Sequence, residues 1–271
     1  MGIHISLRTE SDISFFKRYI NGILDINEAK TVLISSGYYN STVTSDIFNL
    51  IQHSNIEKVK LFGGKNYPSY FREFFKSKDE NPSLASYKEK PFSYYRILHN
   101  KTLNIVQKIK DSKISEVKKL ENDVRNDLNF LEFFGLLNSL SSSKKGFSAE
   151  LRLFTTINSN WHAKIMIILD KDNIPLAGII GSSNLTKPPY EEKIGYFNYE
   201  SDVVLYNPVY ESNFESIRNS IVNETMNDIS VNKHSLPIAT KIDQSLDSVS
   251  EIERLKDLVD ILERNSNIFS F

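Results

Sequence analysis

Residues Trp161 to Asp202 read WHAKIMIILDKDNIPLAGIIGSSNLTKPPYEEKIGYFNYESD, and this stretch decides the fold. Two apolar runs in it flank the turn-rich sequence DKDNIP, a pattern that predicts a β-hairpin. Side chains at positions i and i+2 share one face of a strand, so His162 and Lys164 point the same way. Ser182 and Asn184 have the same spacing after the second run. The hairpin is therefore expected to bring the two pairs together in one polar pocket.

A carboxylate completes the polar set expected at this hairpin. Glu200 lies just ahead of a further apolar run, DVVLY, at 202–206. An imidazole can attack phosphorus or protonate a leaving oxygen, and a lysine supplies a fixed positive charge. Hydroxyl and amide groups can donate hydrogen bonds to the charged oxygens. The pocket therefore has the groups that cleavage of a phosphodiester requires.

This arrangement resembles the phospholipase D superfamily, whose signature is H-x-K-x4-D followed by G-S-x-N and a later glutamate. The resemblance implies that His162 forms a covalent phosphohistidine. It also implies that Lys164, Ser182 and Asn184 bind the phosphate oxygens. Glu200 matches the carboxylate that orients the imidazole. No cofactor and no metal ion are expected in such a mechanism.

The aspartate of the signature is where this chain departs from the pattern. Five residues, rather than four, separate Lys164 from Asp170, because Leu169 occupies the expected position. Either Asp170 or Asp172 could take the role of the family's aspartate through a bulge in the strand. No histidine or further carboxylate lies near these two aspartates in the sequence, so we predict no metal site there.

The chain has one complete copy of the motif. His99-Asn100-Lys101 is a second H-x-K, but it lies in a stretch with helical spacing and no G-S-x-N follows it. We interpret it as an exposed helix face. Superfamily enzymes use two copies, one histidine attacking and the other protonating the leaving group. The resemblance therefore implies a homodimer in which two His162 residues face each other across a two-fold axis.

The single-motif form is similar to the nuclease branch of the superfamily, which includes catalytic domains of metal-independent restriction endonucleases. This implies a metal-independent DNA nuclease with a role in bacterial defence, including antiviral defence, together with a partner protein such as an ATPase. Two alternatives remain open. One is a phospholipase or phosphatidyl transferase, and the other is a non-catalytic phospholipase D-like scaffold subunit.

Composition is that of an ordinary globular protein. The 271 residues carry a net charge of −1 and include no cysteine, which excludes disulfides and thiolate metal sites. No apolar run approaches the roughly 20 residues of a membrane span. The N-terminus lacks an export signal, so we expect a cytoplasmic protein. A net charge near zero argues against a global basic field for binding nucleic acid.

Basic and aromatic residues are interleaved in one part of the sequence. Residues 58–78 combine lysines and Arg72 with several tyrosines and phenylalanines. Such a stretch can grip a phosphate backbone and stack bases, and Lys65 is its candidate substrate contact. The alternative is a partly buried loop and helix with a solvated polar face.

A strand, a loop, a helix and a second strand are predicted near the N-terminus. The strands are 31–36 and 58–62, and the helix is 44–52 with Thr44 or Ser45 as its N-cap. The loop after the first strand is expected near the active site. Its residues Tyr38, Tyr39 and Asn40 are therefore candidate substrate contacts, although the aromatic pair could equally be buried.

The remaining pattern predicts an α/β protein with a mixed sheet flanked by helices. Residues 1–226 form the expected catalytic domain, with a helical insertion at about 86–140, a strand at 150–155 and a helix from Pro208 to about Met226. Residues 227–245 are polar and read as a linker. The C-terminal part, 246–271, contains an amphipathic helix that packs on its own domain or on a partner.

Overall fold

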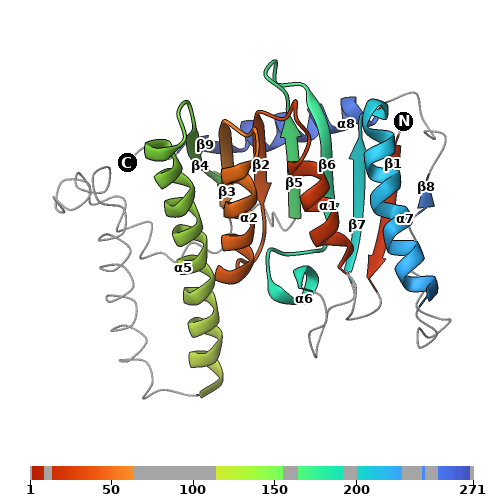
Figure 1. Ribbon diagram of the computed structural model, residues 1–271. Coiled ribbons are helices and arrows are strands. Elements are labelled where there is room, and N and C mark those ends of the chain that lie inside the picture. The colour runs from red at the N-terminus through yellow and green to blue at the C-terminus, as the bar shows by residue number, and fades with distance from the viewer. Residues whose placement is uncertain are drawn as a thin grey trace.

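A mixed β-sheet forms the framework of the protein (Figure 1). The computed structural model describes residues 2–8, 14–63, 114–154, 164–191, 200–227, 240–241 and 250–268. The strands within these residues are β1 (Gly2–Arg8), β2 (Thr31–Ser35), β3 (Lys58–Gly63), β4 (Ser148–Phe154), β5 (Lys164–Leu169), β6 (Pro175–Gly181), β7 (Glu200–Tyr206), β8 (Thr240–Lys241) and β9 (Ser266–Ile268). Their order in the sheet is β8-β1-β7-β6-β5-β2-β3-β4-β9. Strands β2, β3 and β4 are mutually parallel, and the other neighbouring pairs are antiparallel.

Helices cover both faces of this sheet. They are α1 (Phe15–Leu24), α2 (Ser41–His53), α5 (Ile114–Ser143), α6 (Lys187–Tyr190), η2 (Pro208–Tyr210), α7 (Glu211–Asn227) and α8 (Glu251–Arg264). Figure 1 shows α1, α2, α5 and α7 on one face and α8 across the other. The predicted fold class, an α/β protein with a mixed sheet flanked by helices, is confirmed.

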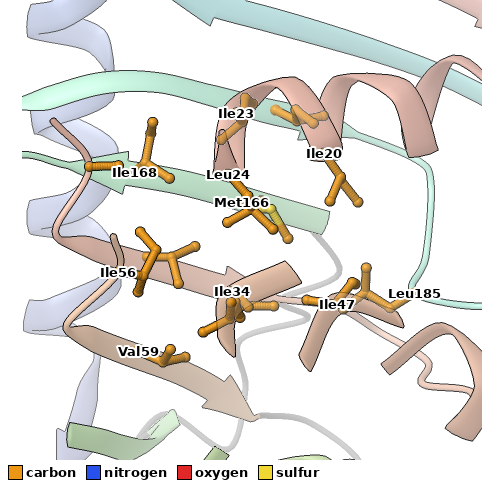
Figure 2. Packing of buried hydrophobic residues seen from close by; sticks show 14 of the residues in the cluster. Ile20, Ile23, Leu24, Ile34, Ile47, Ile56, Val59, Met166, Ile168 and Leu185 are labelled. Atoms are coloured by element: carbon orange, nitrogen blue, oxygen red, sulfur yellow. The ribbon is translucent and has the colours of Figure 1, made fainter. Parts of the chain in front are cut away.

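The middle strand β5 is buried on both faces. Met166 and Ile168 point into the larger core, where they meet α1 side chains such as Ile20 (Figure 2). Ile165 and Ile167 point into the smaller core beneath α8. A strand covered on both faces needs apolar residues at every position, which explains the unbroken run in its sequence. Each such isoleucine contributes about 1.5–3 kcal/mol by leaving water.

The sheet begins earlier in the chain than the sequence indicated. Strand β1 pairs antiparallel with β7, and α1 follows it with Ser14 as N-cap. The Ser14 hydroxyl accepts a hydrogen bond from the Lys17 backbone amide at 3.1 Å. The sequence pattern predicted a first strand at 31–36 and neither β1 nor α1. Both β1 and α1 depend on contacts with distant parts of the chain, because α1 packs against the sheet and against α7.

Helix α2 starts before its predicted N-cap. Asn40 is the N-cap, and its side-chain oxygen accepts a hydrogen bond from the Thr42 backbone amide at 3.0 Å. The prediction of Thr44 or Ser45 is therefore wrong. The Thr44 hydroxyl instead donates back to the Asn40 carbonyl at 3.1 Å, as threonines inside helices do.

The C-terminal helix packs on its own sheet. Leu255 and Leu262 of α8 are fully buried against it. Gly178 of β6 has no side chain, and this lets Leu255 approach closely, since a Cβ there would lie 2.9 Å from a leucine methyl carbon. Lys60 of β3 also forms an ion pair with Glu263 of α8. Of the two open alternatives for this helix, packing within the chain is the one observed.

Other predicted segments lie only partly in the described chain. Of the helical insertion at 86–140, α5 is described from Ile114 and runs on to Ser143. The helix predicted from Pro208 begins as the 3-10 turn η2 before α7. Within the predicted linker 227–245, β8 pairs with β1, and residues 228–239 and 242–245 lie outside the described residues. In the described parts of the chain, no helix combines the length and apolarity needed to span a bilayer.

Candidate functional site

The polar residues of the predicted hairpin gather where three neighbouring strands end. Strand β5 begins at Lys164, β6 ends at Gly181, and β7 begins at Glu200. The register pairs Lys164 with Gly181, and Gly181 with Asp202. The hairpin exists as predicted, and α6 follows its G-S-S-N turn at the same edge of the sheet (Figure 1). His162 lies outside the described residues.

Ser182 and Glu200 are joined directly. The Ser182 hydroxyl donates to a Glu200 carboxylate oxygen at 2.5 Å and accepts from the Ser201 backbone amide at 2.9 Å. Glu200 is 7% exposed but Ser182 is exposed, so this hydrogen bond is only partly shielded from water. Because the Ser182 proton is directed at Glu200, Ser182 holds the carboxylate in place as it stands. Donating to a phosphate oxygen would require this hydroxyl to rotate.

Lys164 supplies a cation beside the same carboxylate. Its side chain is buried, and this burial lowers the pKa of the ammonium group, while the charge of Glu200 opposes the shift. A cation with little water around it acts on a bound anion more strongly than a surface lysine does. Lys164 and Glu200 therefore lie close enough to interact electrostatically.

Asn184 is held by the loop that follows β2. Its side-chain oxygen accepts hydrogen bonds from the backbone amides of Gly37 at 3.1 Å and Tyr38 at 3.0 Å, and from the Ser36 hydroxyl at 3.4 Å. Donors converging on one atom identify that atom as the oxygen. Across the described residues, no acceptor lies within hydrogen-bond distance of the amide nitrogen. That nitrogen is the half of the side chain that can still donate to a ligand.

The same loop is held from its other side by α5. The Asn126 side chain accepts from the Tyr39 backbone amide at 2.6 Å and donates to the Gly37 carbonyl at 3.3 Å. Asn129 donates to the Tyr39 carbonyl at 2.8 Å. Neither asparagine was predicted. Their spacing of three residues puts them on one helix face, but their partner is far away in the sequence.

The loop residues proposed as substrate contacts have different positions. Tyr38 is 40% exposed, so its ring is available to a ligand. Tyr39 is 5% exposed, its hydroxyl lies between the Ser36 amide and the Phe62 carbonyl, and burial raises its pKa well above the usual value. Asn40 caps α2. Tyr39 and Asn40 therefore have structural roles in place of the expected contacts, and Lys65 lies outside the described residues.

Asp170 shapes the hairpin turn. One of its carboxylate oxygens accepts from the backbone amides of Asp172 and Ile174, both at 2.8 Å. The turn also contains Asn173 with a φ of 61°. It lies at the end of β5 opposite Lys164, about 20 Å away at roughly 3.3 Å per strand residue. The register shift near Leu169 is present, but neither Asp170 nor Asp172 reaches the site.

Asp202 is a buried carboxylate beside these residues that the sequence pattern did not predict. It is 4% exposed and follows Glu200 by two positions, on the same face of β7. Its carboxylate accepts from the Ser183 hydroxyl at 2.5 Å and from the Ser183 backbone amide at 3.2 Å. Burial raises its pKa to about 6, against the lowering effect of the Ser183 hydrogen bonds. An acidic residue at a buried strand position was the available signal.

The described part of the chain also holds a buried polar cluster in which the His4 ring nitrogens lie 3.0 Å from the Tyr19 and Tyr206 hydroxyls and 3.3 Å from Glu215. None of its histidine and carboxylate residues form a group of three or more able to hold a metal ion. A groove of about 780 Å³ lies over α1 between α2 and α7. It carries both signs of charge, with Lys17 and Arg18 beside Asp46, and none of the predicted site residues lines it.

Comparison with known proteins gives a distant structural similarity. No protein family model matches the sequence, and no curated protein matches it. Among solved structures, the chain is similar to a phosphatidylserine synthase from Haemophilus influenzae, at 12% sequence identity and a TM-score of 0.37. The alignment covers 97% of this chain and 46% of that one. The present chain thus spans less than half the length of that protein.

Proposed function

We propose that this protein is a metal-independent phosphodiesterase of the phospholipase D type, acting on DNA. The observation that carries the proposal is that Lys164, Ser182 and Glu200 meet at the ends of three adjacent strands. Lys164 follows His162 by two residues in the sequence. A buried cation and hydroxyl or amide donors stabilise an anionic transition state, and a carboxylate can orient the attacking imidazole. The G-S-x-N turn and the later glutamate support the same assignment.

In the proposed reaction, neutral His162 attacks phosphorus in line with the leaving oxygen. A nitrogen–phosphorus bond forms as the phosphorus–oxygen bond to the leaving group breaks. The leaving oxygen takes a proton from a second histidine in its imidazolium form. Water then attacks the phosphohistidine, giving up a proton to that second histidine, and His162 is released. An imidazole of ordinary pKa, about 6.5, supplies both forms near neutral pH.

The other residues have distinct tasks in this scheme. Lys164 neutralises charge on the phosphoryl oxygens, and the amide nitrogen of Asn184 donates to one of them. Glu200 holds the far ring nitrogen of His162, and Ser182 holds Glu200 at 2.5 Å. Tyr38 is the exposed aromatic residue on the neighbouring loop, and a ring in such a place can stack on a base. The exposure of this ring is the reason for proposing DNA over a lipid headgroup as the substrate.

The function is tested by offering both substrate classes under chelation. The protein is incubated with plasmid DNA and, separately, with phospholipid vesicles, each in excess chelator. We expect the DNA to be nicked or cleaved at the same rate with and without chelator, because Lys164 supplies the positive charge in place of a metal ion. Strict dependence on magnesium or manganese would contradict the phosphohistidine mechanism. Cleavage of vesicle lipids alone would indicate that the site is that of a phospholipase or phosphatidyl transferase.

A second expectation concerns assembly. One His162 per chain cannot attack and protonate in the same step, so we propose that two chains share one site across a two-fold axis. Wild-type chains are co-expressed with an excess of His162→Ala chains. When wild-type chains are about one tenth of the total, activity per wild-type chain should fall about tenfold, since only dimers of two wild-type chains have both histidines. Activity proportional to the wild-type chains, or a fully active monomer in sedimentation, would contradict sharing.

A further inference from the structure

A second carboxylate, that of Asp202, lies behind the proposed site and is hydrogen-bonded to Ser183 of the G-S-S-N turn. We infer that Asp202 is a positioning residue that fixes Ser183, and thereby sets where Ser182 and Asn184 stand in the site. The chemistry of the site rests on the proposed function, whereas the anchoring of Ser183 does not. Both Asp202 oxygens are used: one accepts the Ser183 hydroxyl at 2.5 Å and the other accepts its amide at 3.2 Å.

Each residue of the turn has a different partner. Ser182 binds Glu200, Ser183 binds Asp202, and Asn184 binds the loop after β2. Ser183 is the buried member of the three. Because its side chain and its amide are both held, the residues on either side of it have little freedom to shift. A displacement of about 1 Å at such a point can cost about 100-fold in rate.

Gly181 makes room for this anchor. A Cβ built there would lie 2.0 Å from a carboxylate oxygen of Asp202 and 2.7 Å from its Cα. Gly181 and Asp202 are also paired across β6 and β7. The first residue of the G-S-S-N turn therefore lacks a side chain at the point where the carboxylate passes. The glycine, the middle serine and the aspartate form one arrangement.

The anchor depends on the charge of Asp202. The ionised carboxylate accepts both hydrogen bonds, whereas the protonated form carries a proton on one oxygen, so the contact with the buried Ser183 hydroxyl becomes a weaker hydrogen bond between neutral groups. Glu200 on the same strand raises the pKa of Asp202 further, and Lys164 on β5 is the cation that interacts with Glu200. On the neighbouring strand β1, the Ser6 hydroxyl donates to the backbone carbonyl of Asp202 at 3.3 Å. Among the described residues of β1, no charged group shifts the pKa of Asp202. The anchor is therefore intact above about pH 6 and weakened below it.

Protonation of Asp202 should affect stability and activity in opposite directions. The folded-state pKa of Asp202, about 6, lies above its ordinary value of 3.8. The folded state therefore binds this proton more tightly than the unfolded state does. The stability that protonation contributes is present below about pH 4 and is lost as pH rises through about 6. Asp202→Asn removes the buried charge and should be at least as thermostable as the wild type at about pH 8.

The test compares Asp202→Asn with Asp260→Asn, the same change on the exposed face of α8. NMR follows the Asp202 carboxyl carbon and the Ser183 amide proton with pH. In the wild type and in Asp260→Asn, both signals should titrate together near pH 6, and in Asp202→Asn the Ser183 amide should be flat. Cleavage rates should fall about 10- to 100-fold in Asp202→Asn, in kcat more than in KM.

A second variant separates anchoring from folding. Ser183→Ala removes one hydrogen bond that lowers the pKa of Asp202, so that pKa should rise and the rate should fall as in Asp202→Asn. A Ser183 amide that does not follow Asp202 would overturn the anchor. So would wild-type rates and an unchanged pH profile in a folded Asp202→Asn protein. A wild type that cleaves no phosphodiester would sink the proposed function alone, because the NMR titration needs no substrate.

Discussion

Replacing His162 with alanine is expected to reduce phosphodiester cleavage by about 10⁴-fold or more, because the group that forms the covalent intermediate is lost. Circular dichroism and the thermal midpoint should stay close to those of the wild type. Rates are measured on plasmid DNA under single-turnover conditions. In the wild type, rapid acid-free quenching should trap a phosphorylated histidine that is stable to alkali and labile to acid, and the variant should show none.

The matched control is His99→Ala, which alters the second H-x-K of the chain. This variant should cleave at the wild-type rate, because no G-S-x-N follows His99. Loss of activity in His99→Ala together with normal activity in His162→Ala would assign the nucleophile to the other copy. Activity in both variants would exclude a phosphohistidine at either position.

Removal of Lys164 is the second large effect. Lys164→Ala should lower kcat about 100- to 1,000-fold, the usual cost of one preorganised charge or donor at a transition state. KM should change less, since the charge on the phosphoryl oxygens matters most in the transition state. Lys30→Ala is the control, because Lys30 pairs with Glu57 at the surface and such pairs contribute little. A normal kcat in Lys164→Ala would remove this lysine from the mechanism.

The pH profile gives a sharper test of the same residue. Burial lowers the pKa of Lys164 below the ordinary 10.5, so the charged form is lost at a lower pH than for a free lysine. Activity should therefore decline on the alkaline side before about pH 10.5. In Lys164→Arg the charge persists, and any remaining activity should lack that decline. An alkaline limb that is identical in both proteins would assign it to another group.

Local patterns in the sequence determined the elements that carry the site. The hairpin of β5 and β6 follows from two apolar runs around DKDNIP, and its ends place Lys164 near the G-S-S-N turn. Glu200 was found because it heads an apolar strand. Strand register and turn chemistry depend on residues a few positions apart, so one sequence is enough to read them. The predicted α8 helix follows in the same way from its amphipathic spacing.

Only the tertiary structure decided what those residues touch. Asn184 is locked by amides nearly 150 positions earlier in the chain, and Tyr39 by an asparagine 87 positions later. The Asp202 anchor exists because Gly181 lacks a side chain where β7 passes. Such contacts join segments that share no local pattern, and they form only when the order of strands in the sheet brings them together. The sequence by itself therefore determined which groups end at this edge of the sheet, and long-range packing decided which of them bind one another.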